Sequence, residues 1–213
     1  MMLGKINNFL KKNRLFTRQK KGSHKAQSLV EIALTLPLLL MLLSGLVEFG
    51  FMLNYYLSLV DSTREVARVY SNFDPIENVS TFYPGAVDGI ILSLEPRLVT
   101  DTSRKIVFDA AEGDDIIISA YSVSGGTATL LPSTSGAEYH WSNNQSSKLN
   151  TSEVNSRLIA TAPNTGLLVI EVFYSYDQVL GLPWLAMIPD PTILYAYTVM
   201  PLSSAEPTAT PSP

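Results

Sequence analysis

The sequence predicts an α+β protein, in which a long N-terminal transmembrane spine helix precedes a small extracytoplasmic domain with an antiparallel sheet. Three features of the chain lead to this prediction. A basic segment comes first, a long and nearly uncharged apolar segment follows it, and short segments rich in β-branched and aromatic residues make up much of the rest. The 213 residues leave room for one modest domain beyond the apolar segment.

The basic segment is interpreted as a cytoplasmic leader, residues 1–26. Residues 1–25 contain eight of the fifteen basic residues and no acid, whereas the chain from Asp61 onward contains seven bases and seventeen acids. Positive charge directly before an apolar segment keeps that side in the cytoplasm. We therefore expect anchoring in the cytoplasmic (inner) membrane with the C-terminal domain outside the cell. Nucleic-acid binding, the other interpretation of a basic arm, is not expected.

The apolar segment Leu29–Val60 contains two charged residues, Glu31 and Glu48. The sixteen residues between these two acids would span about 24 Å as a helix, slightly less than a hydrocarbon core of about 30 Å. The sequence therefore predicts a single-pass span over about residues 32–54, with one carboxylate near each boundary. Such placement reduces the cost of holding two acids in a membrane helix. A cleaved secretory signal fits less well, because its apolar core is shorter and ends in a small-residue site.

The helix is expected to continue beyond the membrane and to cover residues 27–72. Apolar and charged residues recur at helical spacing past Val60, and Asp74-Pro75 is expected to end the helix. Pro37 lies inside the apolar segment, where proline is tolerated, and predicts a kink.

The outer domain is predicted to cover residues 73–202, with a disordered Pro/Thr-rich tail at 203–213. Strands are expected at 103–110, 114–126, 165–178 and 192–201, and helices at 84–99 and 150–162. The segment AEGD at 111–114 is expected to join the first two strands as a hairpin. Asn150 and Glu153 have the spacing of a capping box. The apolar loop, residues 179–191, has two open interpretations: it packs on its own core, or it contacts the membrane or a partner.

Composition argues against catalysis and against metal binding. The chain has no cysteine and only two histidines, His24 and His140, and we expect neither a metal site nor a cofactor. No nucleophile-elbow motif or phosphate-binding glycine loop is present, so an enzyme is not expected. The acids of EGDD at 112–115 lack the spacing of a calcium loop, and a turn explains them better.

The apolar helix also carries a family resemblance. AQSLVEIALTLPLLLMLLSGLVEFG, followed by STREVARVY, resembles the TadE-like family, minor pseudopilins of tight-adherence (Flp-type) pilus assembly. Family members typically show Gly-Gln-x-hydrophobic-Val-Glu-Phe, an Ala-Leu-x-Leu-Pro-Leu run and a Gly-x-x-Glu-Phe-Gly box. The residues that carry the resemblance are Gln27, Val30, Glu31, Ala33, Leu34, Pro37, Leu38, Gly45, Glu48, Phe49, Gly50, Arg64, Ala67 and Arg68. The resemblance covers about residues 26–70 and implies a pilin-like architecture.

The resemblance implies roles for particular residues. A prepilin peptidase would cut between Ala26 and Gln27, although the family prefers glycine where Ala26 stands. Glu31 would then be the fifth residue of the mature chain and would neutralise the new N-terminal amine of a neighbouring pilin-like subunit during assembly. Glu48 is a second candidate for a contact with another helix. The alternative function is a membrane-anchored surface domain that binds a ligand or a protein and never enters a pilus.

Overall fold

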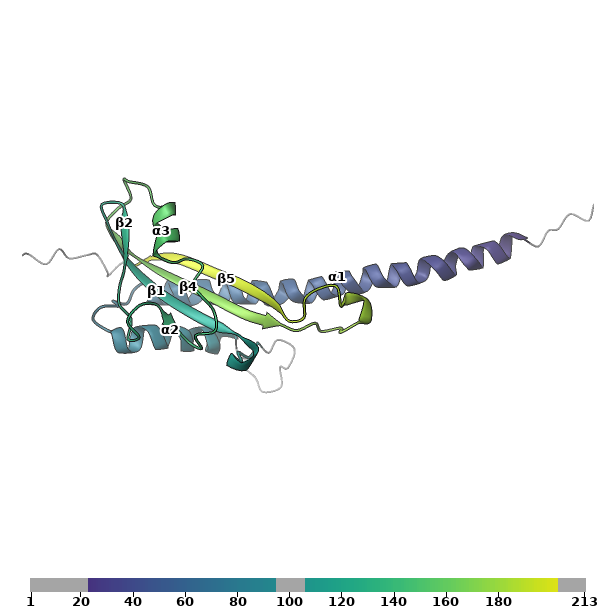
Figure 1. The fold of residues 1–213 in the computed structure, drawn as a ribbon, viewed down its shortest axis with the longest axis horizontal. Coiled ribbons are helices and arrows are strands. Elements are labelled where there is room, and N and C mark those ends of the chain that lie inside the picture. Colours follow the sequence, from purple (N-terminus) through teal and green to yellow (C-terminus); the bar gives the residue numbers. More distant parts are fainter. Residues whose placement is uncertain (1–22, 95–105, 203–213) are drawn as a thin grey trace, which may run out of the picture. The chain divides into compact units, whose positions relative to one another are not determined.

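The computed structural model describes residues 23–94 and 106–202 (Figure 1). The chain divides into two compact units, of which the first ends at Leu46 and the second begins at Val47. Most of the predicted leader and all of the predicted tail lie outside the described residues. A long N-terminal apolar helix followed by a small antiparallel sheet domain confirms the predicted α+β class.

The N-terminal helix α1 covers Ser23–Tyr70, against the prediction of 27–72. In the first unit, large apolar side chains from Leu29 to Leu46 are exposed along the helix. The stretch Gln27–Tyr70 is, among the described residues, the one helix long and apolar enough to cross a membrane. A helix that is apolar all round and stays exposed is typical of a membrane span, since lipid can cover what the protein does not.

The second unit is built around one antiparallel sheet. Its strands are β1 (Asp115–Ser124), β2 (Thr127–Leu130), β3 (Tyr139–His140), β4 (Thr165–Tyr176) and β5 (Thr192–Leu202). The order is β2-β1-β4-β5, and β3 pairs with β1. All four pairings are antiparallel. The predicted strands at 114–126, 165–178 and 192–201 are thus confirmed as β1, β4 and β5.

Each face of the sheet buries a different set of apolar side chains. On one face, Ile116 and Ile118 of β1 share a core with α1 and with helix α2 (Val79–Leu94). On the other face, Tyr121 and Val123 of the same strand pack with the short helix α3 (Thr151–Arg157). This arrangement follows from the two-residue period of a strand, which sends alternate side chains to opposite faces. The two faces of β1 therefore hold the domain together from both sides.

Helix α2 begins five residues before its predicted start at Pro84. The residues directly before this proline, Phe82 and Tyr83, are buried, and Phe82 contacts the ring of Tyr70 at a centroid distance of 5.6 Å. Packing of these aromatic rings outweighs the missing N–H of the proline. Residues 95–99 of the prediction lie outside the described part of the chain.

The prediction of a strand at 103–110 is wrong over the residues that the structure describes. Residues 106–109 form no strand, and Ala110–Glu112 is a 3₁₀ turn. Asp109 accepts a hydrogen bond from the Ala111 amide (2.8 Å), and Gly113 closes the turn with a φ of 87°. Local side-chain hydrogen bonds thus replace strand pairing here, and the expected hairpin at 111–114 is also wrong.

Strands β2 and β3 were not predicted from the sequence, and one helix is shorter than predicted. Gly125 and Gly126, which were expected to end a strand, instead turn β1 into the hairpin partner β2, and both have positive φ angles. Helix α3 ends at Arg157 instead of residue 162. Its predicted cap is confirmed, because Asn150 Oδ1 accepts a hydrogen bond from the Glu153 amide (3.1 Å).

Candidate functional site

Glu31 lies on the exposed surface of α1 in the first unit. Its carboxylate accepts a hydrogen bond from Gln27 Nε2 (3.3 Å), one turn earlier on the same helix. The hydroxyl of Thr35 donates to the backbone carbonyl of Glu31 (2.8 Å). The carboxylate is therefore open to a partner.

The predicted junction between Ala26 and Gln27 lies within α1, because this helix begins at Ser23. The helix also continues through Pro37 without a break in its assignment. A kink at Pro37 and cleavage at the junction both stay predictions.

Glu48 has a different environment, in the second unit. Its side chain is only 3% exposed, although it lies on a helix whose neighbouring residues Phe49 and Phe51 are open to the surroundings. The Tyr176 hydroxyl donates to Glu48 Oε1 at 2.6 Å. The amide of Val179 donates to the same oxygen and the amide of Leu180 to the other, each at 2.9 Å. One carboxylate thus joins α1, the end of β4 and the start of the apolar loop.

These three donors explain how an acid can be held in an apolar helix. A carboxylate without hydrogen-bond partners is strongly disfavoured away from water, whereas one that accepts several good hydrogen bonds is not. Burial, followed by the hydrogen bond to Glu48, raises the pKa of Tyr176, so its hydroxyl remains a donor at neutral pH. All the described partners of the Glu48 carboxylate lie within its own chain. A contact between Glu48 and a helix of another subunit stays a prediction.

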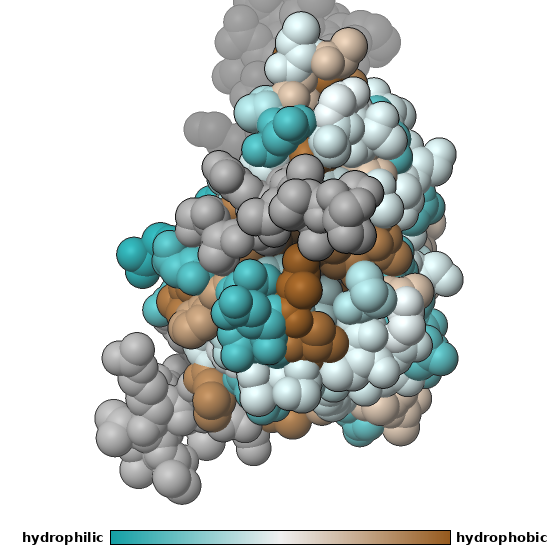
Figure 2. Space-filling view, turned by 90° about the vertical axis from the view of Figure 1, so that its left-hand side faces the viewer, coloured by the Kyte–Doolittle hydropathy of each residue, from teal (hydrophilic) through white to brown (hydrophobic). Residues whose placement is uncertain are grey.

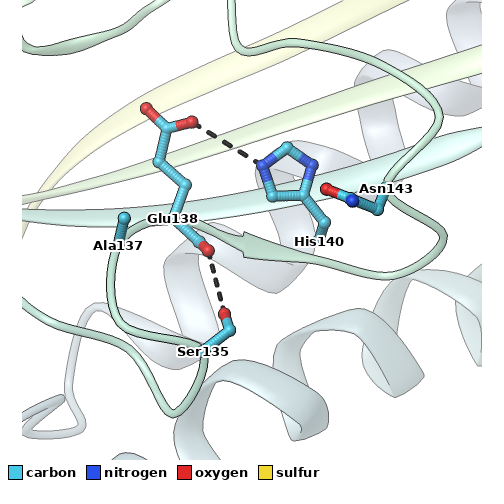
Figure 3. Close-up of a pocket in the computed structure, with 5 residues that line it drawn as sticks. All are labelled: Ser135, Ala137, Glu138, His140 and Asn143. Carbon is cyan, nitrogen blue, oxygen red and sulfur yellow. Dashed lines mark hydrogen bonds and ion pairs between the residues drawn. The ribbon is translucent and has the colours of Figure 1, made fainter.

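A pocket lies beside the short strand β3 and is lined by Ser135, Ala137, Glu138, His140 and Asn143 (Figure 3). His140 Nε2 lies 3.7 Å from the Glu138 carboxylate, and the Ser135 hydroxyl donates to the Glu138 carbonyl at 3.0 Å. The other ring nitrogen, Nδ1, lies 3.2 Å from Asp115 Oδ2. The imidazole thus bridges two acids, and the Ser135 hydroxyl contacts a backbone carbonyl, so the pocket shows no serine–histidine pair of the kind that nucleophilic catalysis needs.

The two aspartates of the EGDD segment accept hydrogen bonds from backbone amides elsewhere in the domain. Asp115 is fully buried and accepts hydrogen bonds from the amides of Ser142 (3.0 Å) and Gln145 (3.1 Å). The neighbouring Asp114 accepts one from the amide of Ser175 at 2.6 Å. In the part of the chain that the structure describes, no group of three or more histidines, cysteines or acids could hold a metal ion.

Asp115 also supplies a prediction about pH. Burial acts to raise the pKa of Asp115, but the amides of Ser142 and Gln145 and the His140 ring outweigh it and hold the pKa below its usual value. A lowered pKa stabilises the fold above the unfolded pKa, and this stability is lost as the pH falls through the folded pKa. We expect Asp115→Asn to destabilise the domain by about 1–3 kcal/mol at pH 7, and by less below about pH 4.

Denaturant titrations of both proteins between pH 3 and pH 7 measure this difference. The contribution of Asp114 to stability has the opposite pH dependence, because burial raises the pKa of this side chain. The comparison of the wild type with Asp115→Asn cancels that contribution, since Asp114 is present in both. A destabilisation of equal size at every pH would contradict the prediction.

The fold and these contacts define a class of protein. A helix able to cross a membrane is followed by a small α+β domain, which is consistent with membrane anchoring. Residues 26–68 match the family model described as TadE-like protein, which confirms the resemblance over that segment. The match suggests an association with Tad/Flp pilus systems and includes both Glu31 and Glu48. The searches of curated proteins and of solved structures gave no match.

Both carboxylates are evident from the sequence, but the partners of Glu48 are not. Its spacing predicts a position near a membrane boundary, whereas Tyr176 and Val179 follow more than 120 positions later in the chain and no local pattern connects them to it. Two features of the sequence could have indicated this contact. One is an acid, Glu48, inside an apolar helix, and the other is an apolar loop whose packing partner the sequence does not identify. Only folding of the sheet brings these two features together.

Proposed function

We propose that this protein is a non-enzymatic, membrane-anchored, pseudopilin-like component of a tight-adherence (Flp-type) pilus assembly system. Residues 26–68 support this proposal through their match to the TadE-like family. The observation that carries it is the position of Glu31, an exposed carboxylate near the start of the apolar segment of α1. Acids at membrane depth are usually functional, because their desolvation has to be offset by a partner.

The partner in this proposal is the α-amine that cleavage before Gln27 would create on a neighbouring subunit. Opposite charges attract strongly where water is scarce, and each lowers the desolvation cost of the other. Exposure of the Glu31 side chain supports such a pairing, since its one described side-chain contact is a long hydrogen bond to Gln27. Glu31 would thus set the register between subunits while the outer domain faces the cell exterior.

Replacement of Glu31 by glutamine is expected to reduce incorporation into the assembled pilus fraction by about tenfold or more, because the ion pair is lost while the shape is kept. Quantitative immunoblots of sheared pili and of the membrane fraction measure the ratio of assembled to unassembled protein. Glu65→Gln is the matched control: it removes an equal charge from an exposed position of the same helix. Protein levels in the membrane are expected to be equal in all three strains.

N-terminal sequencing of the membrane-purified protein tests the cleavage step directly. A mature chain that begins at Gln27 supports the proposal. A chain that retains its leader in cells with an active prepilin peptidase, together with absence of the wild-type protein from the pilus fraction, would favour the anchored surface domain instead.

A further inference from the structure

The apolar loop, residues 179–191, exposes apolar side chains in an unusual concentration. Met187 is 93% exposed, and Val179, Trp184 and Ile188 are each exposed by 40% or more. Leu185 alone among the large apolar residues of this loop is buried. Side chains of this kind that stay exposed together mark a surface meant for lipid or protein.

Several groups of this loop are hydrogen-bonded by Gln178 or within the loop itself. Gln178 Nε2 donates to the carbonyls of Leu185 (3.3 Å) and Ile188 (3.1 Å), and the Gln178 amide donates to Asp190 Oδ1 (3.1 Å). The Ile188 amide donates to the Leu185 carbonyl at 2.9 Å. A segment can enter a low-polarity environment only when its backbone groups have such partners. These hydrogen bonds lower the cost of moving the segment around Leu185 and Ile188, with its exposed apolar side chains, into a less polar environment.

The position of this loop is fixed by Glu48. The Val179 and Leu180 amides bind its carboxylate, so the loop covers the one charge that α1 carries between Ile32 and Val60. Phe49, Phe51 and other large apolar residues of α1 up to Leu57 stay exposed. The Glu48 carboxylate is thus covered, whereas the apolar side chains around it on α1 are exposed. Contact with lipid favours this arrangement.

The length of the apolar segment also places the outer membrane boundary near Glu48. The sixteen residues before Glu48 span about 24 Å, and a hydrocarbon core of about 30 Å needs about four more. The outer boundary of the membrane then falls just beyond Glu48, at the level of the apolar loop that this residue holds.

The far end of the sheet has a different surface. β2 and the start of β4 pair with the same end of β1, from its two sides. The apolar loop follows the other end of β4, a separation of about 35 Å along the strand. Where its atoms are coloured, the side of the molecule in Figure 2 is a mixture of hydrophilic areas with small hydrophobic ones. The apolar loop lies at the other end of the sheet, where its first amides bind Glu48.

We propose that the apolar loop inserts Trp184, Met187 and Ile188 into the outer membrane–water interface beside α1, as a second membrane attachment that fixes the outer domain against the bilayer. The chain has no lysine or arginine after Arg157, so apolar burial drives this insertion and anionic headgroups contribute little. The attachment rests on α1 crossing the bilayer but requires no pilus.

Fluorescence of single-tryptophan variants tests the insertion. The full chain contains Trp141 and Trp184, so Trp141→Phe leaves the tryptophan in the loop and Trp184→Phe leaves one beside β3 as the matched control. Each variant is placed in lipid nanodiscs at one copy per disc, with plain or brominated phosphatidylcholine. We expect brominated lipid to lower Trp184 emission by about twofold and Trp141 emission far less, since the quencher acts only at short range within the bilayer.

A second variant separates insertion from misfolding. Met187→Asp, made in the Trp141→Phe background, adds a charge at the most exposed position of the loop and is expected to abolish most of the quenching while the domain stays folded. Equal quenching in zwitterionic and anionic lipid is also expected. Unquenched Trp184 in a protein that is retained in the disc would overturn the proposal. So would a change in emission that appears only when several copies share a disc, because a second copy would then cover the loop.

Discussion

Replacing Glu48 by alanine is expected to release the apolar loop and to lower the free energy of unfolding of the outer domain by about 3 kcal/mol. The reason is the set of donors that the carboxylate satisfies. The Tyr176 hydroxyl and the amides of Val179 and Leu180 would lose their acceptor at a position that is almost closed to solvent. A buried donor without an acceptor costs more than the hydrogen bond itself contributes.

Two measurements check this expectation in the full chain in detergent micelles. Denaturant unfolding gives the loss of free energy, and limited proteolysis with a protease that cleaves at apolar residues reports on release of the loop near Met187. Tyr176→Phe removes one donor and keeps the acceptor, so a smaller loss of about 1–2 kcal/mol is expected. Glu31→Ala is the control, because this exposed acid has no partner from another element in the described part of the chain. A Glu48→Ala protein as stable as the control would show that the carboxylate is dispensable for the loop.

The second large effect is expected at Glu171, in the middle of β4. This carboxylate is fully buried and accepts hydrogen bonds from the amides of Lys148 (2.9 Å) and Leu149 (3.2 Å). It also accepts from the hydroxyls of Ser147 and Tyr195. Burial, and then the bond to Glu171, raises the pKa of Tyr195, which therefore stays a donor. Glu171 thus ties the segment before α3 to the two longest strands.

Glu171→Ala is expected to lower the free energy of unfolding by about 3–5 kcal/mol, because four donors lose a charged acceptor inside the domain. Thermal and denaturant unfolding followed by circular dichroism measure the loss. Glu153→Ala is the matched control: it removes an exposed acid that pairs with Arg157 on α3, a contact that contributes less than about 1 kcal/mol. Similar losses in the two variants would contradict the assignment of Glu171 as a buried anchor.

Together these expectations separate two kinds of acid in one chain. Glu31 is exposed, so its replacement is expected to affect assembly and to leave stability unchanged. Glu48 and Glu171 are buried among donors, so their replacement is expected to affect stability first. An acid that acts through partners outside the chain can therefore be distinguished by experiment from one that acts within it.

Elements with strong local patterns were predictable from the sequence. The apolar helix is predictable because a segment with very few charged residues is long enough to cross a membrane. Strands β1, β4 and β5 are long and rich in β-branched residues, and the cap of α3 follows from the spacing of Asn150 and Glu153. In each case the pattern that predicts the element lies within a few residues along the chain.

The errors occurred where particular side-chain contacts, and not the pattern of apolar residues, decide which element forms. Residues 106–110 have strand-like composition, but the hydrogen bonds of Asp109 and Asp114 close a turn there. Pro84 looked like a helix start, but the burial of Phe82 and Tyr83 extends α2 before it. Contacts of this kind leave no periodic pattern in the sequence, so they could not be predicted from it.

The sequence alone determined that this protein has an apolar segment with two acids, one at each end of a sixteen-residue stretch slightly shorter than a hydrocarbon core. It could not determine that the two acids have unlike environments. That difference arises because β4 delivers Tyr176 and the apolar loop to Glu48, across more than 120 residues of chain, while no element of the described chain reaches Glu31. The spacing of charges is a local property, whereas the partner of a carboxylate depends on which segments the sheet brings together.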